Sequence, residues 1–183
     1  MNTVITSKEN ILEAAKDMIL AGKENSLNMR AVAKNCDIAV GSIYNYFPTK
    51  ADLVIAVIAE IWKEIFHSFS IEETKDDFLI LVEDIADSIR RGKEIYPGFF
   101  RKHASYIEDK GKGSSVMDAY FKHIEEALYH TLLNDKKIRK DIWKDDFTAK
   151  DFASFVFRCL RTDFMQEQDN SEFLKQLIVR IVY

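Results

Sequence analysis

The chain has 183 residues, 47% of them hydrophobic and 12% aromatic, which is enough for a sizeable core and excludes the disordered class. Two prolines and six glycines favour long helices over a turn-rich β fold, and there is neither an apolar run of about 18 residues nor a basic-then-apolar leader. The formal charge is −4, but residues 1–50 carry six Lys and Arg against five Asp and Glu, a net +1 that leaves −5 for the remainder. We therefore expect a helical, cytoplasmic protein with a slightly basic head and an acidic body.

The first helix is predicted to begin near Ser7 and to end at Gly22. Thr6 and Glu9 have the spacing of a capping box, with Ser7 as the competing cap. Apolar residues then recur at helical spacing along one face: Ile11, Leu12, Ala15, Met18 and Ile19. This helix is expected to support the two short helices that follow it.

Residues 28–38 predict a short helix and a tight turn. The side chain of Asn28 can accept from the amides of the first helical turn. A narrow apolar stripe follows at i, i+3 and i+4, formed by Met29, Val32 and Ala33. Asp37 tolerates the left-handed conformation well, so the turn is expected at residues 36–38.

The second short helix, about residues 40–47, has an unusual outer face. Ile43 and Phe47 are expected to point inward, one turn apart. The positions left to point outward contain no acid: Val40, Gly41, Ser42, Tyr44, Asn45 and Tyr46. Such groups can reach phosphate oxygens, base edges and thymine methyls, and a glycine lets a partner approach closely. Pro48 ends this helix, so residues 28–48 predict a helix-turn-helix unit.

Several residues of this segment also carry a family resemblance: Ile11-Leu12-Glu13-Ala14-Ala15, Gly22, Val32-Ala33, Gly41-Ser42-Ile43-Tyr44, Tyr46-Phe47-Pro48, Lys50 and Leu53. In order and spacing, residues 7–57 resemble the DNA-binding domain of TetR-type (tetracycline-repressor-like) regulators. Asp37 and Ala39 stand where that family usually has Gly and Ser, and Val40 stands where a basic or polar residue is common. The resemblance implies a DNA-binding domain at residues 1–48 and an effector-binding and dimerisation domain at residues 49–183.

The predicted DNA contacts fall into three groups. Those expected to position the phosphate backbone are Arg30, Ser42, Tyr44, Tyr46 and Lys50. Those expected to reach base edges or to allow close approach are Val40, Gly41 and Asn45, whose amide could read adenine. Asn28 and Ala39 complete the predicted interface.

The rest of the chain predicts further helices and no repeat. A long helix is expected over residues 49–69, a natural lever between head and body, although its position alone does not prove coupling. Gly111 to Gly113 are expected to form a flexible turn. Apolar periodicity places the other helices at about residues 78–91, 99–107, 116–132, 148–164 and 171–182, which gives an all-α fold of about nine helices.

The last two helices are apolar on more than one side. In the monomer reading they are a deep core; in the dimer reading, which the family resemblance favours, they form a four-helix bundle with a second copy. The residues expected at that interface are Phe152, Phe155, Val156, Cys159, Leu174, Leu177, Ile178 and Ile181. A two-fold axis would present two recognition helices to successive major-groove turns about 34–36 Å apart.

The middle helices are rich in aromatic side chains. These residues are either ordinary core or, as the resemblance implies, the lining of a cavity for an apolar effector. The candidate lining residues are Phe99, His103, Tyr106, Met117, Tyr120, Phe121 and Ile124. They do not identify the ligand.

No catalytic residue, metal site or cofactor is predicted. Glu64 and His67 have the Glu-x-x-His spacing of di-iron bundles, but the second such motif is missing. A face containing His123, Glu126 and His130 could chelate one divalent ion or simply be solvated. Two cysteines are present; they are expected to be small buried residues in a reducing compartment, with a redox sensor as the alternative.

These patterns together predict a homodimeric transcriptional repressor. It would leave a pseudo-palindromic operator when a small apolar or amphipathic effector binds. The alternatives are a ligand-independent DNA-binding protein that acts through a protein partner, and a helical metalloenzyme.

Overall fold

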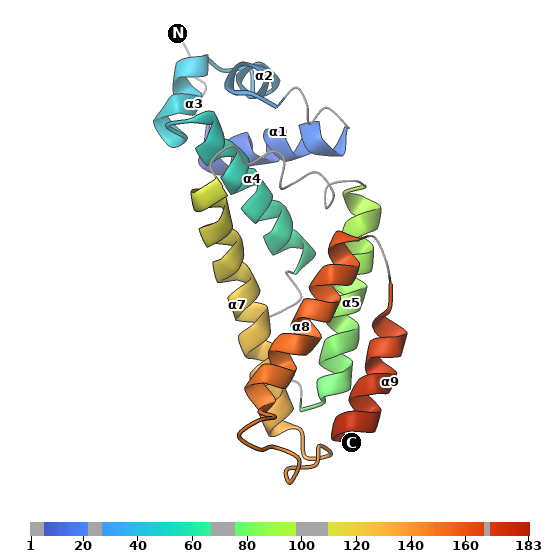
Figure 1. Cartoon of the computed structure of the whole chain (residues 1–183). Coiled ribbons are helices and arrows are strands. Elements are labelled where there is room, and N and C mark those ends of the chain that lie inside the picture. The colour runs from blue at the N-terminus through green and yellow to red at the C-terminus, as the bar shows by residue number, and fades with distance from the viewer. Residues whose placement is uncertain (1–5, 22–26, 67–75, 98–109, 167–168) are drawn as a thin grey trace. The chain divides into compact units, whose positions relative to one another are not determined.

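A computed structural model describes residues 6–21, 27–66, 76–97, 110–166 and 169–183. Within these residues it contains eight α-helices and no strand, with one isolated β-bridge between Lys144 and Phe147 (Figure 1). The helices are α1 (Lys8–Leu20), α2 (Met29–Asn35), α3 (Val40–Tyr46), α4 (Lys50–Ile65), α5 (Phe78–Ile95), α7 (Lys110–Asn134), α8 (Ala149–Met165) and α9 (Ser171–Val182). The all-α prediction is confirmed; the helix expected at residues 99–107 lies outside the described residues.

Local side-chain caps explain where several helices begin. Ser7, not Thr6, caps α1, because its side chain accepts from the Asn10 amide at 3.2 Å. At the start of α4 the capping is reciprocal: the Thr49 amide donates to Asp52 Oδ2 (3.1 Å) and the Asp52 amide donates to Thr49 Oγ1 (3.1 Å).

The helix α7 begins six residues earlier than its apolar pattern predicts. Its first turn includes Gly111 and Gly113, which were expected to form a flexible turn. Glycine in a helix interior costs only about 1 kcal/mol relative to alanine, so a long helix can continue through it. The turn prediction was therefore wrong.

The chain forms two compact units. Unit 1 comprises residues 1–64 and 93–117, and unit 2 comprises residues 65–92 and 118–183. The predicted domain boundary between residues 48 and 49 stays a prediction. None of the helices among the described residues is long and apolar enough to cross a membrane.

Unit 1 contains a small three-helix head. Helix α1 packs on α2, and α2 packs on α3. The fully buried residues of this head and of α4 keep the predicted helical periodicity: Ile11, Ala15, Val32, Ile43, Leu53, Val57 and Ile61. The inward face of each helix was thus correctly predicted from spacing.

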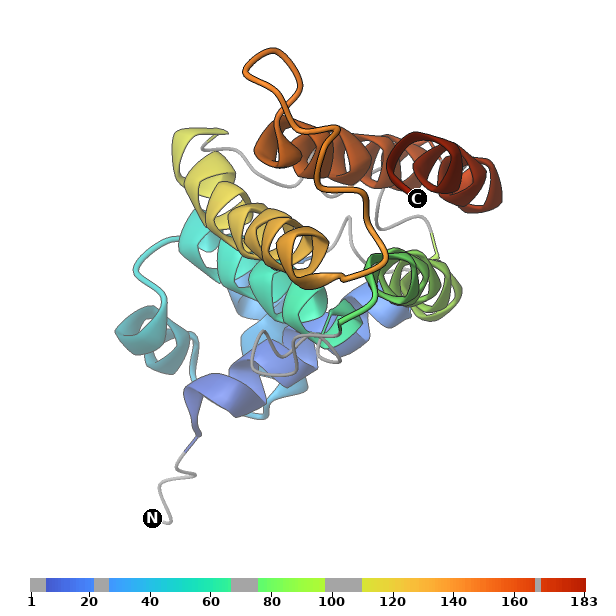
Figure 2. The same ribbon diagram turned by 90° about the horizontal axis from the view of Figure 1, so that it is seen from below.

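Unit 2 is built around α5, α8, α9 and most of α7. Helices α8 and α9 pack against each other, and α9 also lies beside α5 (Figure 2). The core of this unit includes Phe78, Val82, Ile85, Leu128, Leu132, Val156, Leu160, Ile178 and Val182.

Candidate functional site

The helix-turn-helix is held by local backbone and side-chain bonds. The Ala31 amide donates to Asn28 Oδ1 at 3.0 Å, which confirms Asn28 as the cap of α2. Asp37 has φ of 53°, the left-handed conformation that was predicted for the turn. The Ile38 amide closes the turn by donating to the carbonyl of Ala33 at 3.0 Å.

The helix α3 presents the expected outer face. Ile43 and Phe47 are buried, whereas Tyr44 is 50% exposed and Asn45 is exposed. A Cβ placed on Gly41 would meet nothing within 4 Å, so this position is open to a partner. The predicted orientation is confirmed; the contacts with DNA stay predictions.

The flanking positions of the predicted interface are also accessible. Arg30 on α2 and Lys50 at the start of α4 are both exposed, and Ala39 is exposed at the N-cap of α3. Ala39 supplies no side-chain capping hydrogen bond, because its methyl group has no acceptor. Val40 and Ser42 are half-buried, so part of each surface is accessible.

The hydroxyl of Tyr46 has a structural partner. It donates to the Thr6 carbonyl at 2.7 Å and so ties the end of α3 to the residue before the cap of α1. Lys8 lies over the ring of Phe47, 5.7 Å from its centroid, and reinforces the same junction. Tyr46 therefore has a second role, fastening the head, beside the predicted phosphate contact.

The predicted effector pocket falls largely on residues whose surroundings are not described. Phe99, His103 and Tyr106 lie outside the described residues, and Met117 and Tyr120 belong to α7 but their side chains are not described. Two predicted members remain. Ile124 is buried and Phe121 is half-buried. The ring centroid of Phe121 lies 5.6 Å from that of Phe157 and 5.8 Å from the guanidinium carbon of Arg161. The pocket stays a prediction.

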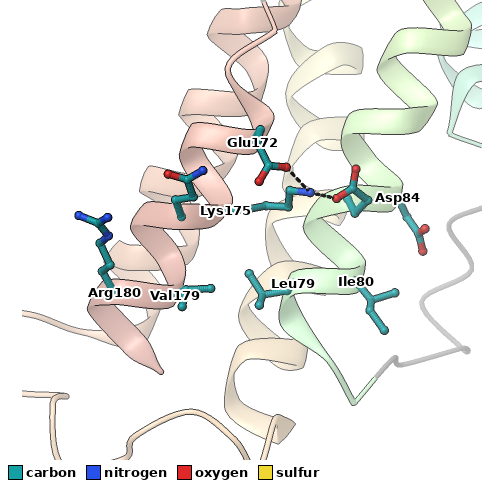
Figure 3. Close-up of a pocket in the computed structure, with 9 residues that line it drawn as sticks. Leu79, Ile80, Asp84, Glu172, Lys175, Val179 and Arg180 are labelled. Atoms are coloured by element: carbon teal, nitrogen blue, oxygen red, sulfur yellow. Dashed lines mark hydrogen bonds and ion pairs between the residues drawn. The ribbon is translucent and has the colours of Figure 1, made fainter.

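A different hollow is present between α5 and α9. It has a volume of about 520 Å³ and is lined by Leu79, Ile80, Glu83, Asp84, Glu172, Lys175, Gln176, Val179 and Arg180 (Figure 3). Ile80 and Val179 are exposed apolar residues in it, and Lys175 bridges Glu83 and Glu172 across one side. None of the predicted pocket residues lines this groove.

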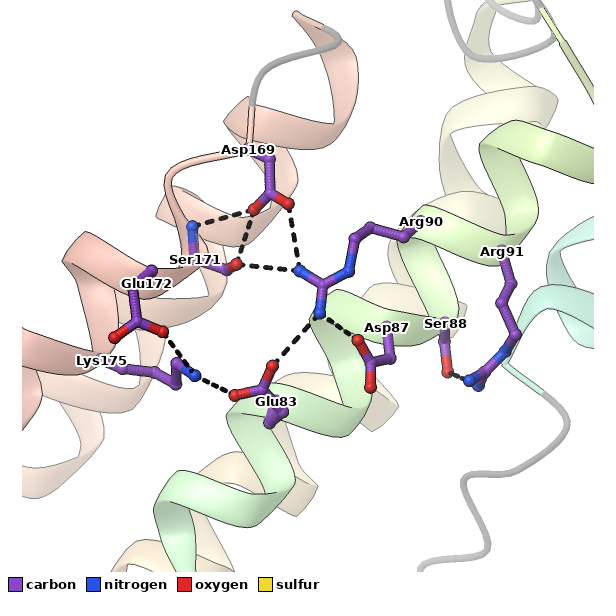
Figure 4. Close-up of polar contacts among 9 residues, drawn as sticks. All are labelled: Glu83, Asp87, Ser88, Arg90, Arg91, Asp169, Ser171, Glu172 and Lys175. Atoms are coloured by element: carbon purple, nitrogen blue, oxygen red, sulfur yellow. Dashed lines mark hydrogen bonds and ion pairs between the residues drawn. The ribbon is translucent and has the colours of Figure 1, made fainter.

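Charged groups join α5 to the start of α9. Arg90 donates to Asp169 (3.1 Å), to Ser171 (3.0 Å) and to Glu83 (3.2 Å), and it also pairs with Asp87 (Figure 4). Burial alone would lower the pKa of Arg90, but the carboxylates of Asp87 and Asp169 outweigh it and raise that pKa. This network could not be predicted from the sequence, because Arg90 and its partner Ser171 are 81 residues apart.

The structure separates the predicted dimer residues into two groups. Phe152, Val156, Leu174 and Ile178 are buried inside unit 2. Phe155 is 42% exposed, and three others keep partial exposure: Cys159, Leu177 and Ile181. Phe173, which was not on the predicted list, is 63% exposed. An outward apolar strip therefore remains on α8 and α9, and its pairing with a second copy stays a prediction.

Among the described residues, the cysteines and histidines form no reactive site. Burial raises the pKa of the Cys36 thiol and that of the Cys159 thiol, so both favour the protonated form. Across the part of the chain that the structure describes, no three His, Cys, Asp or Glu residues are grouped to hold a metal ion. His123 and His130 are exposed, and His67 lies outside that part.

Comparison with known proteins identifies the head. Residues 11–57 match the family "Bacterial regulatory proteins, tetR family". The chain is 36% identical over 58 residues to the HTH-type transcriptional repressor KstR of Rhodococcus jostii, a stretch that covers 32% of this chain and 27% of that protein. The chain thus spans about a quarter of the length of the curated relatives it matches.

Solved structures share the fold over nearly the whole chain. Escherichia coli NemR in its reduced form gives a TM-score of 0.65 at 13% identity, covering 96% of this chain and 96% of that one. The multidrug binding protein EbrR, complexed with imidazole, gives 0.62 at 17% identity, covering 96% and 89%. At these identities the likeness establishes the fold alone.

Proposed function

We propose that this chain is a TetR-type transcriptional regulator and that it acts as a homodimeric repressor of a pseudo-palindromic operator. We assign residues 1–48 to operator binding and residues 49–183 to dimerisation and effector binding. TetR-type regulators are not enzymes, so the metalloenzyme alternative is set aside. The site of action is the cytoplasm, where the operator DNA lies.

The outer face of α3 is the observation that carries operator binding. Tyr44, Asn45 and Gly41 are accessible on a helix whose opposite side is buried. Hydroxyl and amide groups recognise phosphates and base edges, and an accessible glycine permits close approach to a groove. Because the net charge of residues 1–50 is only +1, few phosphate contacts per subunit are available, and two subunits are needed for tight binding.

The outward apolar strip on α8 and α9 supports the dimer. Phe155 and Phe173 expose large rings to solvent, which is unfavourable for an isolated unit. A second copy that covers this strip would bury both rings and pair two heads on one operator. A DNA-binding protein that acts through a protein partner, without an effector, is the remaining alternative.

A fluorescence-anisotropy titration tests the proposal directly. The probe is the duplex immediately upstream of the gene, with a scrambled duplex of equal composition as control, at two salt concentrations. Binding of two subunits per site, with the scrambled duplex weaker by about 10³-fold or more, is the expected result. Equal, salt-sensitive binding to both duplexes would contradict a sequence-specific regulator.

The Tyr44→Ala variant tests the recognition helix. The dimer presents this side chain twice, so loss of two contacts to charged phosphates is expected to weaken operator binding by at least about tenfold. Ile80→Ala is the matched control, because Ile80 on α5 is also 50% exposed but belongs to unit 2. Unchanged binding in Tyr44→Ala would remove α3 from the interface.

A further inference from the structure

The carboxylate of Glu64 joins three segments of unit 1. It lies in the last turn of α4, where its Oε2 accepts from Lys16 Nζ at 2.8 Å and from the Tyr96 hydroxyl at 3.0 Å. Lys16 belongs to α1 and is also paired with Glu13 at 2.8 Å. Tyr96 follows directly after the last residue of α5, Ile95. One acceptor atom therefore connects α1, α4 and the end of α5.

Two of these three groups are more sheltered than those of a typical surface ion pair, whereas the side chain of Glu64 is 44% exposed. Tyr96 is only 1% exposed, and the side chain of Lys16 is 13% exposed. Burial raises the pKa of Tyr96, and its hydrogen bond to Glu64 raises it further. Burial would also raise the pKa of Glu64, but the donors Lys16 and Tyr96 outweigh it and hold that pKa below its ordinary value. At neutral pH the cluster is therefore a carboxylate held by an ammonium group and a phenol.

The position of the cluster in the chain gives it a particular importance. Unit 1 ends its first segment at Glu64 and begins its second at Lys93. The carboxylate of Glu64 thus lies at one crossing between the units, and Tyr96 lies three residues after the other. The cluster therefore joins the two chain segments of unit 1 to each other.

Helix packing continues from the cluster toward the predicted interface. Helix α1 packs on α2, and α2 packs on α3, which presents Tyr44 and Asn45. None of Lys16, Glu64 and Tyr96 belongs to α2, α3 or the first turn of α4, where most of the predicted DNA contacts lie. Any effect of the cluster on operator binding must therefore be indirect.

We propose that Lys16, Glu64 and Tyr96 form a positioning latch that fixes α1 against the end of α4 and so sets the orientation of the recognition head. The inference rests on the proposed DNA-binding function and assigns these residues to its regulation. A latched head is competent for the operator. Displacement of Tyr96 removes one donor to Glu64, and displacement of the end of α4 moves Glu64 itself. Either change frees α1 and lowers the affinity for the operator.

Tyr96→Phe and Glu64→Gln are the variants that test the latch. The first removes one hydroxyl and keeps the buried ring; the second keeps the shape and removes the charge. Tyr96→Phe removes one hydrogen bond to a charged group, so operator affinity is expected to fall by about three- to tenfold. Glu64→Gln weakens the bonds from both Lys16 and Tyr96, so its loss of affinity is expected to be at least as large. Glu60→Gln is the matched control, because Glu60 is also on α4 and, among the described residues, its ion pair is a local one with Lys63, at 3.5 Å.

Circular dichroism and thermal melting must show that all three variants are folded at the titration temperature. Lower melting temperatures with operator affinity equal to that of the wild type would overturn the latch, because the cluster would then only stabilise the fold. Equal losses of affinity in Glu60→Gln would also overturn it, since that variant leaves the cluster intact.

Hydrogen exchange supplies a readout that needs no DNA. Tyr96→Phe is expected to speed amide exchange in α1 and at residues 93–96, and to leave α8 unchanged. Uniform acceleration throughout unit 1, or none, would overturn the latch. If the wild-type protein fails to bind its operator specifically, the proposed function fails, and the exchange pattern still decides whether Glu64 fixes α1.

Discussion

Replacement of Asp135 by Ala is expected to cause a large loss of stability in unit 2. This carboxylate is completely buried. Its Oδ2 accepts from the Phe78 amide at 3.0 Å and from the Tyr183 hydroxyl at 2.5 Å, and its Oδ1 accepts from the Lys137 amide at 2.8 Å. It therefore caps α5 from 57 residues away and also anchors the residue after α9.

The magnitude follows from the donors that would be left without an acceptor. The Lys137 amide belongs to an exposed residue and can bind water instead, so losing its hydrogen bond should cost little stability. The Phe78 amide belongs to a fully buried residue, and the Tyr183 hydroxyl is partly buried. Hydrogen bonds to a charged acceptor contribute about 1.5–3 kcal/mol each, so Asp135→Ala should cost about 3–5 kcal/mol. Tyr183→Phe, which removes one of these bonds, should cost about 1.5–3 kcal/mol.

Urea unfolding followed by the fluorescence of Trp143 measures this loss. Trp143 and Asp135 both lie in the connection between α7 and α8, which belongs to unit 2. The other tryptophan, Trp62 of unit 1, is replaced by Phe in every protein compared, so that the fluorescence reports unit 2 alone. Asp141→Ala is the control, because Asp141 is an exposed acid of that connection. A loss below about 1 kcal/mol in Asp135→Ala would refute the role of this carboxylate as a buried cap.

Two further predictions concern the dimer and the head. Phe173→Glu places a charge on the strip that the proposed dimer buries, so sedimentation or light scattering should report monomers. Ile80→Glu on α5 is the control and should remain dimeric; a dimeric Phe173→Glu protein would exclude this strip from the dimer interface. Tyr46→Phe removes the 2.7 Å hydrogen bond to the Thr6 carbonyl and should destabilise the head by about 1 kcal/mol. Amide exchange at the start of α1 should then be faster; unchanged exchange would mean that this bond does not hold α3 to the start of α1.

The elements that could be predicted from the sequence depend on neighbours in the chain. Asn28 caps α2, Asp37 makes the left-handed turn, and Ile43 and Phe47 point inward. Each of these features is decided within about four residues, by capping chemistry, backbone sterics or the 3.6-residue period. Thr6 and Ser7 were both candidate caps of α1, and Ser7 makes the bond.

The elements that could not be predicted depend on distant partners. Asp135 looks like one more acid in a charged connection, and only the folded chain shows that Phe78 and Tyr183 converge on it. Glu64 was noted only for its spacing to His67, whereas its donors are 48 and 32 residues away. Periodicity indicates that a helix face is apolar, but it cannot tell a face covered by the same chain from one covered by a second copy. For this reason Phe152 and Phe155 received the same assignment, although one is buried and the other is exposed.

The same distant contacts suit α9, which has only 12 residues, to the dimerisation role proposed for it. An isolated helix of this length is marginal in water. Here Asp169, just before α9, binds Arg90 of α5, and Lys175 in the middle of α9 pairs with Glu83 of α5. In the last turn, the carbonyl of Val182 accepts from the Arg139 amide at 2.9 Å. A helix fixed at three points presents Phe173 with little conformational freedom left to lose on association, which lowers the entropic cost of pairing. Dimerisation should therefore depend on the polar contacts that hold α9 to α5 and to Arg139 as well as on the apolar strip itself.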